Sequence, residues 1–183
     1  MTILVDIDST ITNFGEILLL ANNQLHNTSY LYTDITSYDW FDQTFTNPWE
    51  PTAYQCFWNT VEVNPAAVTA IEQWVKQGHK VYLVTASFFN STLGYKIHKT
   101  LKPFNPELIN ERNVIIAQDK AVVMGDVLID DAPHNILSFP AYAVTYAQPW
   151  NQDIPYPHSI LRANDWNKID AHVKRIECAK YKK

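Results

Sequence analysis

Residues 3–12, ILVDIDSTIT, join a short apolar run directly to two aspartates that are separated by one residue. An apolar run of this kind is typical of a buried strand. A carboxylate at the end of a buried strand is costly unless a cation or hydrogen-bond donors compensate its charge. Asp6 and Asp8 therefore indicate either a solvated strand end or a site that holds a metal ion and carries out chemistry.

The composition restricts the class of protein. A chain of 183 residues that is 46% hydrophobic can bury one sizeable core and a small accessory lobe. The net charge of −5 argues against a surface that binds duplex nucleic acid. The sequence contains neither a signal-peptide pattern nor a run of about 20 apolar residues, and Cys56 and Cys178 lack metal or redox spacing. We expect a soluble, cytoplasmic protein with no membrane partner.

Four further apolar runs have the length of strands and alternate with helical patterns. Nearly continuous apolar character is typical of parallel strands that are buried on both faces. The clearest helical pattern begins at Asn64 and Pro65 and ends at Gly78. This alternation predicts a Rossmann-like α/β fold, an open parallel sheet with helices on both faces. The further strands are expected at 80–85, 113–117, 126–131 and 141–146, and the further helices at 91–101 and 165–180.

Residues 14–61 do not follow this alternation. Their first part predicts a helix at 16–25, and the rest is an aromatic and polar stretch without strong strand signals. We predict a small, mainly helical cap inserted after the first strand, with residues 1–13 and 62–183 forming the core. The chain has four glycines, and none of them forms a glycine-rich phosphate loop.

Polar side chains with catalytic potential follow four of the expected strands. In open α/β sheets ligands bind beyond the carboxyl ends of the strands, so these side chains are expected to converge. Their ligand atoms are all oxygen, which favours Mg²⁺ over Zn²⁺, and Mg²⁺ often bridges to a phosphate. An aspartate can then attack phosphorus while a hydroxyl and an ammonium hold the phosphate oxygens. These residues are Asp6, Asp8, Thr85, Lys120, Asp130 and Asp131.

Simpler interpretations exist for individual residues. Lys120 alone would be a solvated lysine in a turn, and Thr85 a β-favouring residue at the end of a strand. Asp126 is an alternative metal ligand. A calcium loop does not fit, because Ile11 stands where an EF-hand requires glycine and the segment follows a strand.

Taken together, the motifs resemble those of the haloacid dehalogenase-like (HAD) phosphohydrolases. DIDST at 6–10, Thr85, Lys120 and GDVLIDD at 125–131 match the four motifs of this superfamily in order. More closely, the chain resembles the 5′(3′)-deoxyribonucleotidase family along most of its length, and the cap matches poorly.

The resemblance implies a role for each matching residue. Asp6 would be the nucleophile and a metal ligand, and Asp8 would act as general acid and base while its backbone carbonyl binds the metal. Asp131 would complete the Mg²⁺ site, although Asp130 remains an alternative. Thr85 would hold the phosphate together with the backbone of Ala86, and Lys120 would neutralise its charge.

Aromatic residues are the candidates for contact with a nucleobase. The resemblance places Phe14 against the base or the sugar, and we expect Trp40 and Phe41 to be walls of the pocket, because base stacking contributes about 1–3 kcal/mol per base. Aromatic residues are also common in small cores, so a purely structural role is the alternative for each.

These observations predict a magnesium-dependent phosphomonoesterase of nucleoside monophosphates, most of all deoxyribonucleoside 5′-monophosphates, that works through an aspartyl-phosphate. One rival is a phosphatase of another small ester or of a nucleic-acid end. Another is a nucleotide-binding protein without turnover. The expected partner is a small nucleotide, and the oligomeric state stays open, with a homodimer as one outcome.

Overall fold

Six parallel strands form one sheet in the computed structural model, which describes residues 1–87, 90–157 and 160–181. The strand order is β3-β2-β1-β4-β5-β6, and every neighbouring pair is parallel. This is the order of a doubly wound Rossmann-like sheet, and it confirms the predicted α/β fold class. The strands are β1 (Thr2–Asp6), β2 (Lys80–Thr85), β3 (Val114–Ile116), β4 (Val127–Asp130), β5 (Tyr142–Tyr146) and β6 (Ile160–Ala163).

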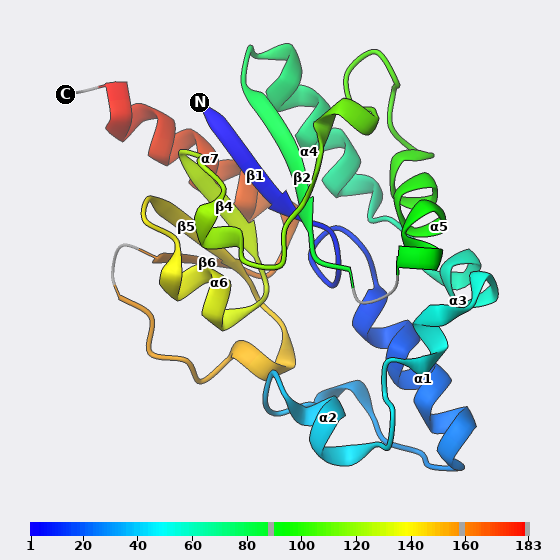
Figure 1. Ribbon diagram of the computed structural model, residues 1–183. Coiled ribbons are helices and arrows are strands. Elements are labelled where there is room, and N and C mark those ends of the chain that lie inside the picture. Colours follow the sequence, from blue (N-terminus) through cyan, green and yellow to red (C-terminus); the bar gives the residue numbers. More distant parts are fainter. Residues whose placement is uncertain (88–89, 158–159, 182–183) are drawn as a thin grey trace.

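Helices cover both faces of the sheet, with α4 and α7 behind it and α6 in front of it in Figure 1. Because successive side chains of a strand point to opposite faces, Ile3 and Val5 of β1 pack on the side of Trp74, in α4. Leu4 packs on the other side with Phe139, which directly follows α6. The helices are α1 (Phe14–His26), α2 (Trp40–Thr44), α3 (Gln55–Thr60), α4 (Pro65–Lys76), α5 (Asn90–Leu101), α6 (Pro133–Ser138) and α7 (Trp166–Tyr181).

Helix α4 begins and ends where its sequence predicts. The side chain of Asn64 accepts a hydrogen bond of 2.9 Å from the amide of Ala66, and Pro65 occupies the first helical position, where its missing N–H is not needed. Gly78, just beyond the helix, has a φ of 89°, which glycine adopts without steric cost.

Helices α1, α2 and α3 lie together beyond the carboxyl ends of the strands (Figure 1). They enclose an apolar cluster that includes Leu18, Phe41 and Phe57 and that Trp150, from the segment after β5, completes. The two connections to the sheet domain lie side by side, because Thr12 and Val63 form an antiparallel bridge. We refer to residues 14–61 as the cap, and these boundaries remain a prediction from the sequence.

Two elements of the core were not predicted. Strand β6 has four residues and includes Arg162, so its apolar run is too short to be recognised. Helix α6 has six residues, fewer than two turns, and therefore shows no helical period.

Two further observations concern the described residues as a whole. None of their helices is both long enough and apolar enough to cross a membrane. Cys56 and Cys178 are free and exposed.

The contact between β1 and the turn before β4 gives a test of core packing. A Cβ atom added at Gly125 would lie 2.7 Å from Cγ of Leu4, which is fully buried. We expect Gly125→Ala to lower the free energy of unfolding by about 1–3 kcal/mol through overpacking, measured by urea denaturation. Gly94→Ala is the matched control, because a Cβ at this site in α5 meets nothing within 4 Å. It should raise stability by about 0.5–1 kcal/mol; equal effects of both substitutions would contradict the packing argument.

Candidate active site

Strand β1 and the tight loop after it place the first two carboxylates at the carboxyl end of the sheet. Asp6 is the last residue of β1 and is buried. Ser9 has a φ of 57°, in the left-handed region, and its hydroxyl accepts a hydrogen bond of 3.1 Å from the amide of Gly15. The carbonyl of Ser9 accepts a second bond, of 2.5 Å, from the side chain of Gln148. The loop that carries Asp8 is therefore fixed from two sides.

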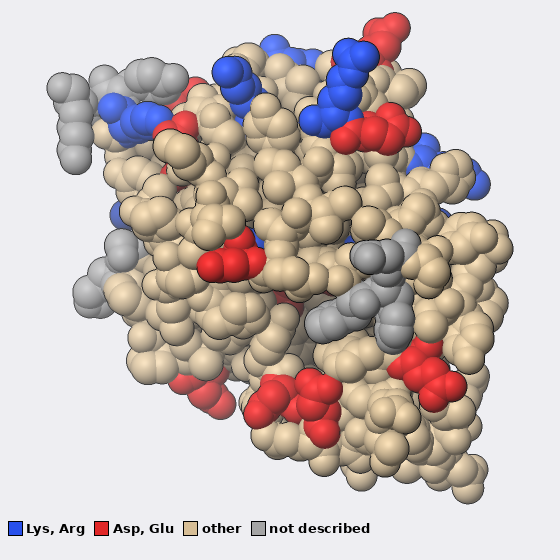
Figure 2. Space-filling view, viewed as in Figure 1, with Lys and Arg blue, Asp and Glu red and all other residues tan. Residues whose placement is uncertain are grey.

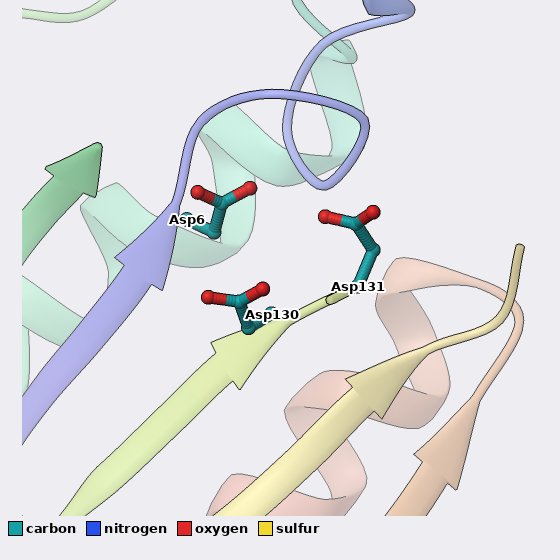
Figure 3. A group of neighbouring side chains, drawn as sticks. All are labelled: Asp6, Asp130 and Asp131. Atoms are coloured by element: carbon teal, nitrogen blue, oxygen red, sulfur yellow. The ribbon is translucent and has the colours of Figure 1, made fainter. Parts of the chain in front are cut away.

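Two more carboxylates come from the end of β4, the strand beside β1. The strand order reverses at β1, and the crevice at such a reversal is where open α/β sheets bind ligands. Figure 3 shows Asp6, Asp130 and Asp131 with their carboxylates facing a common space. One oxygen of each lies within 4.8 Å of the others, and all three residues are buried.

Lys120 supplies the cation for this cluster. It lies in a short 3₁₀-helix, η4 (Lys120–Val122), and is only 4% exposed. Its ammonium contacts the carboxylate of Asp6 and donates to that of Asp130 at 2.7 Å. The simpler interpretation of Lys120 as a solvated lysine in a turn is therefore wrong. Its neighbour Asp119 is exposed.

The charges of this cluster are not balanced. Burial raises the pKa of Asp6, and it raises that of Asp131 as well, since both carboxylates are removed from water and lie near like charges. Burial opposes the charged form of Lys120, but the charges of Asp6 and Asp130 outweigh it and raise the lysine pKa. Three carboxylates share one ammonium, so the site favours a further cation.

The donor set fits Mg²⁺. Hard cations of this size prefer carboxylate and carbonyl oxygens, and the three carboxylates supply such oxygens at the required proximity. Asp130 is already engaged, because it accepts hydrogen bonds from Lys120, from the amide of Ala132 at 2.8 Å and from Asn135 at 3.1 Å. These bonds suit Asp130 to orient Lys120, whereas Asp131 forms no ion pair with this lysine and is the better candidate ligand.

Asp131 is also held by neighbouring side chains. It accepts a hydrogen bond of 3.2 Å from the hydroxyl of Thr10 and one of 3.0 Å from the indole of Trp150. Asn151 donates to its backbone carbonyl at 2.7 Å. These bonds fix the orientation of the carboxylate, as expected for partners of a metal ligand.

The predicted phosphate-binding residues lie at the end of β2. Thr85 is fully buried, and its hydroxyl donates to the carbonyl of Ala86 at 3.1 Å. Ala86 lines the cavity above the carboxylates, whereas Thr85 does not belong to the lining. The structure therefore places Ala86 at the cavity wall and buries Thr85 next to it in the chain.

A cavity of about 500 Å³ joins the carboxylates to the cap. In the view of Figure 2 the surface is hollowed between the cap and the sheet domain. Phe14 and Phe41 line this cavity, together with Trp49 and Trp58. Trp40 does not belong to the lining; its ring packs against that of Phe45, 5.6 Å away, inside the cap.

Sequence reasoning missed several residues of the site. Lys96 of α5 is buried at the cavity and contacts Asp8, yet nothing in the pattern of its helix sets it apart from an ordinary surface lysine. Asn135 and Trp150 were not assigned a role either. His134 lines the cavity and lies 4.9 Å, ring to ring, from Tyr38 of the cap.

Comparison with known proteins relates the sequence of this chain to nucleotidases. The family described as "5′ nucleotidase, deoxy (Pyrimidine), cytosolic type C protein" matches residues 1–179. A 5′(3′)-deoxyribonucleotidase of Clostridium acetobutylicum is 24% identical over 184 residues, which cover 96% of each chain. A 5′(3′)-deoxyribonucleotidase of Bacillus subtilis is 27% identical over 93 residues, 50% of this chain and 51% of that one.

Solved structures share the fold. A hydrolase from Pseudomonas syringae has a TM-score of 0.60 at 17% identity, covering 96% of this chain and 99% of that one. A haloacid dehalogenase-like hydrolase from Xanthomonas campestris has a TM-score of 0.61 at 11% identity, covering 100% and 98%. A HAD hydrolase from Bacillus subtilis, solved bound to magnesium, has a TM-score of 0.55 at 14% identity, covering 94% and 97%.

The charge imbalance predicts that Mg²⁺ stabilises the protein. At about 100 times its Kd, Mg²⁺ should contribute about 2.7 kcal/mol, which raises the Tm by roughly 5–10 °C for a chain of this size. Asp131→Asn should remove most of this shift. Differential scanning fluorimetry with MgCl₂ or with EDTA measures both.

Asp153→Asn is the control for that experiment, since Asp153 is exposed and lies outside the cavity lining. It should keep the full shift. A Tm that does not respond to Mg²⁺, or an equal shift in both variants, would contradict the proposed metal site.

Proposed function

Because this chain belongs to the 5′-nucleotidase family described as deoxy (pyrimidine), cytosolic type C, we propose that it hydrolyses deoxyribonucleoside 5′-monophosphates. Membership of the family makes it a phosphoric monoester hydrolase that acts on nucleotides. The choice of deoxyribonucleoside 5′-monophosphates rests on one observation: the two ends of the cavity differ in chemistry. One end holds Asp6, Lys120 and Asp131, and the other is walled by aromatic rings of the cap.

Asp6 is the nucleophile of this proposal. Its carboxylate opens into the cavity and contacts Lys120, which keeps it in place and attracts the phosphate oxygens. In the first step a carboxylate oxygen of Asp6 bonds to phosphorus while the bond from phosphorus to the nucleoside oxygen breaks. The product is an aspartyl-phosphate.

Asp8 moves the proton in both steps. Its carboxyl group gives a proton to the departing nucleoside oxygen. In the second step its carboxylate takes a proton from water as the water oxygen attacks phosphorus and the bond to Asp6 breaks, which releases inorganic phosphate. Asp8 lines the cavity together with Asp6, which suits a carboxylate that exchanges protons with the substrate.

Mg²⁺ is the proposed cofactor, and a neighbour of the same fold is described as bound to magnesium. The carboxylates of Asp6 and Asp131 and the backbone carbonyl of Asp8 would hold it. When bound, the ion neutralises negative charge on the phosphate oxygens. Ala86 would donate its backbone amide to the same phosphate, and Thr85 would support that loop.

The cap provides the surface for the nucleoside. The ring of Phe14 lies 5.6 Å from that of Trp58 at an angle of 26°, so the two form one stacked unit at the cavity wall. Phe57 meets Phe14 edge-on at 5.6 Å and supports it from the side. A base lying against this unit gains stacking energy, whereas a small phosphate ester does not reach it.

The charge of the cap favours a mononucleotide over a nucleic-acid end. Residues 14–61 contain five Asp and Glu residues and no Lys or Arg. In Figure 2 acidic but no basic side chains are visible over the lower part of the molecule, where the cap lies. Such a surface repels the additional phosphates of an oligonucleotide. We also propose a cytosolic location, since the matching family is described as cytosolic.

A panel of phosphate esters tests this function. Deoxyribonucleoside and ribonucleoside monophosphates, sugar phosphates and a 5′-phosphorylated oligonucleotide are each incubated with Mg²⁺ and with EDTA, and released phosphate is measured. We expect release from the deoxyribonucleotides that EDTA abolishes. Preference for another ester would change the substrate, and binding without turnover would identify a nucleotide-binding protein.

Asp6→Asn should lower the turnover of deoxyribonucleoside monophosphates by about a thousandfold or more, because the amide cannot form the aspartyl-phosphate. Acid-quenched incubation with a ³²P-labelled substrate should label the wild-type protein and leave the variant unlabelled. Asp153→Asn is the control and should keep both turnover and labelling. Normal phosphate release by Asp6→Asn would rule out the nucleophile.

Phe14→Ala should raise the KM for deoxyribonucleoside monophosphates by roughly 5- to 150-fold, which corresponds to a loss of about 1–3 kcal/mol of stacking. The KM for β-glycerol phosphate, which has no ring that can stack, should change little. Steady-state kinetics with both substrates measures the difference. Equal increases for the two esters would argue that Phe14 only maintains the cap.

A further inference from the structure

Lys96 is a buried cation that the chemistry described so far does not use. It lies in α5 and is 3% exposed. Its ammonium contacts the Oδ2 atom of Asp8 and donates to the carbonyl of Ala86 at 2.9 Å. The ammonium also lies 5.6 Å from the ring centre of Trp58 in the cap. One side chain therefore touches the proton-transfer residue, the phosphate-binding loop and the cap.

This placement differs from that of an ordinary surface lysine. Removing an ammonium from water is costly unless charged and polar partners replace the water. Lys99, on the same helix, also bonds to the cap, through the carbonyl of Asn59 at 2.9 Å, but this bond is solvent-exposed. A link between α5 and the cap thus needs no buried charge, and the burial of Lys96 calls for another explanation.

The two oxygens of Asp8 have different surroundings. Oδ2 is held by Lys96, whereas Oδ1 is buried with no hydrogen-bond partner among the residues described. A carboxylate that is fixed through one oxygen cannot turn freely, so the whole group keeps a constant direction. Asp8 lines the cavity next to Asp6, so the direction that Lys96 imposes decides how its carboxylate meets a substrate or a water molecule.

We propose that Lys96 is a positioning residue: it holds the carboxylate of Asp8 in the direction that proton transfer requires. This inference rests on the proposed function. The contact with Trp58 adds a link to the cap, because the aromatic face of Trp58 attracts the ammonium of Lys96. The position of the cap therefore influences the position of Lys96 and, through it, that of Asp8.

The choice of leaving group separates this role from simple maintenance of the fold. A nucleoside alkoxide leaves poorly and needs a proton from Asp8, whereas p-nitrophenolate leaves without one. A positioned general acid or base contributes typically 10²- to 10⁴-fold to a rate. Loss of positioning should therefore slow formation of the aspartyl-phosphate from a nucleotide far more than from p-nitrophenyl phosphate.

Rapid-quench and stopped-flow kinetics with Lys96→Met measure this difference, and Lys99→Met is the matched control. With a deoxyribonucleoside monophosphate we expect the first step to slow by about 10²-fold or more. With p-nitrophenyl phosphate we expect a burst of p-nitrophenolate whose rate falls less than tenfold, followed by slow release of phosphate, because the second step also needs Asp8. Equal slowing of the first step with both esters, or equal rates in Lys96→Met and Lys99→Met, would overturn the proposal.

A double substitution covers the case in which Lys96→Met does not fold. Asp8→Asn with Lys96→Met removes both charges and leaves neither unpaired. If Lys96 acts through Asp8, the first step of this double variant matches that of Asp8→Asn alone within about threefold. A further tenfold loss would show that Lys96 acts on the phosphate or on the fold instead. Failure of the proposed function is a separate result, since it would appear as a wild-type protein that releases no phosphate from nucleotides.

Discussion

The buried contact between one ammonium and two carboxylates determines much of this structure. Lys120 reaches Asp6 at the end of β1 and Asp130 at the end of β4, and the three come from separate parts of the chain. Leaving any of these charges buried without a partner would cost several kcal/mol. The strand order that sets β1 beside β4 is therefore the arrangement in which these charges compensate one another. The sheet and the candidate active site depend on the same contact.

Much of this arrangement can be predicted from the sequence, because short local patterns indicate the strands and the helix ends. The apolar runs that end in Asp6, Thr85 and Asp131 indicate both the strands and the edge at which the polar residues meet. The spacing of Asn64, Pro65 and Gly78 indicates one helix with both of its ends. Such signals are short in range, and each can be interpreted without knowledge of the rest of the chain.

The remaining features depend on contacts between distant segments. Lys96 is unremarkable in its helix and becomes a partner of Asp8 only when α5 packs beside the loop after β1. Trp40 and Phe41 are adjacent, yet only Phe41 lines the cavity, because a helix directs neighbouring side chains to different sides. Strand β6 is defined by its pairing with β5 and not by its own composition.

The bridge between Thr12 and Val63 means that the chain leaves the sheet domain and returns to it at nearly the same point. The backbone amide of Asn13 donates to the carbonyl of Glu62 at 3.1 Å, which closes the two ends of the insertion further. The entropy of loop closure depends only weakly on the length of the enclosed segment. Evolution can therefore lengthen, shorten or replace the inserted segment while the sheet and its carboxylates stay unchanged, so that new substrates can be acquired by exchange of one module.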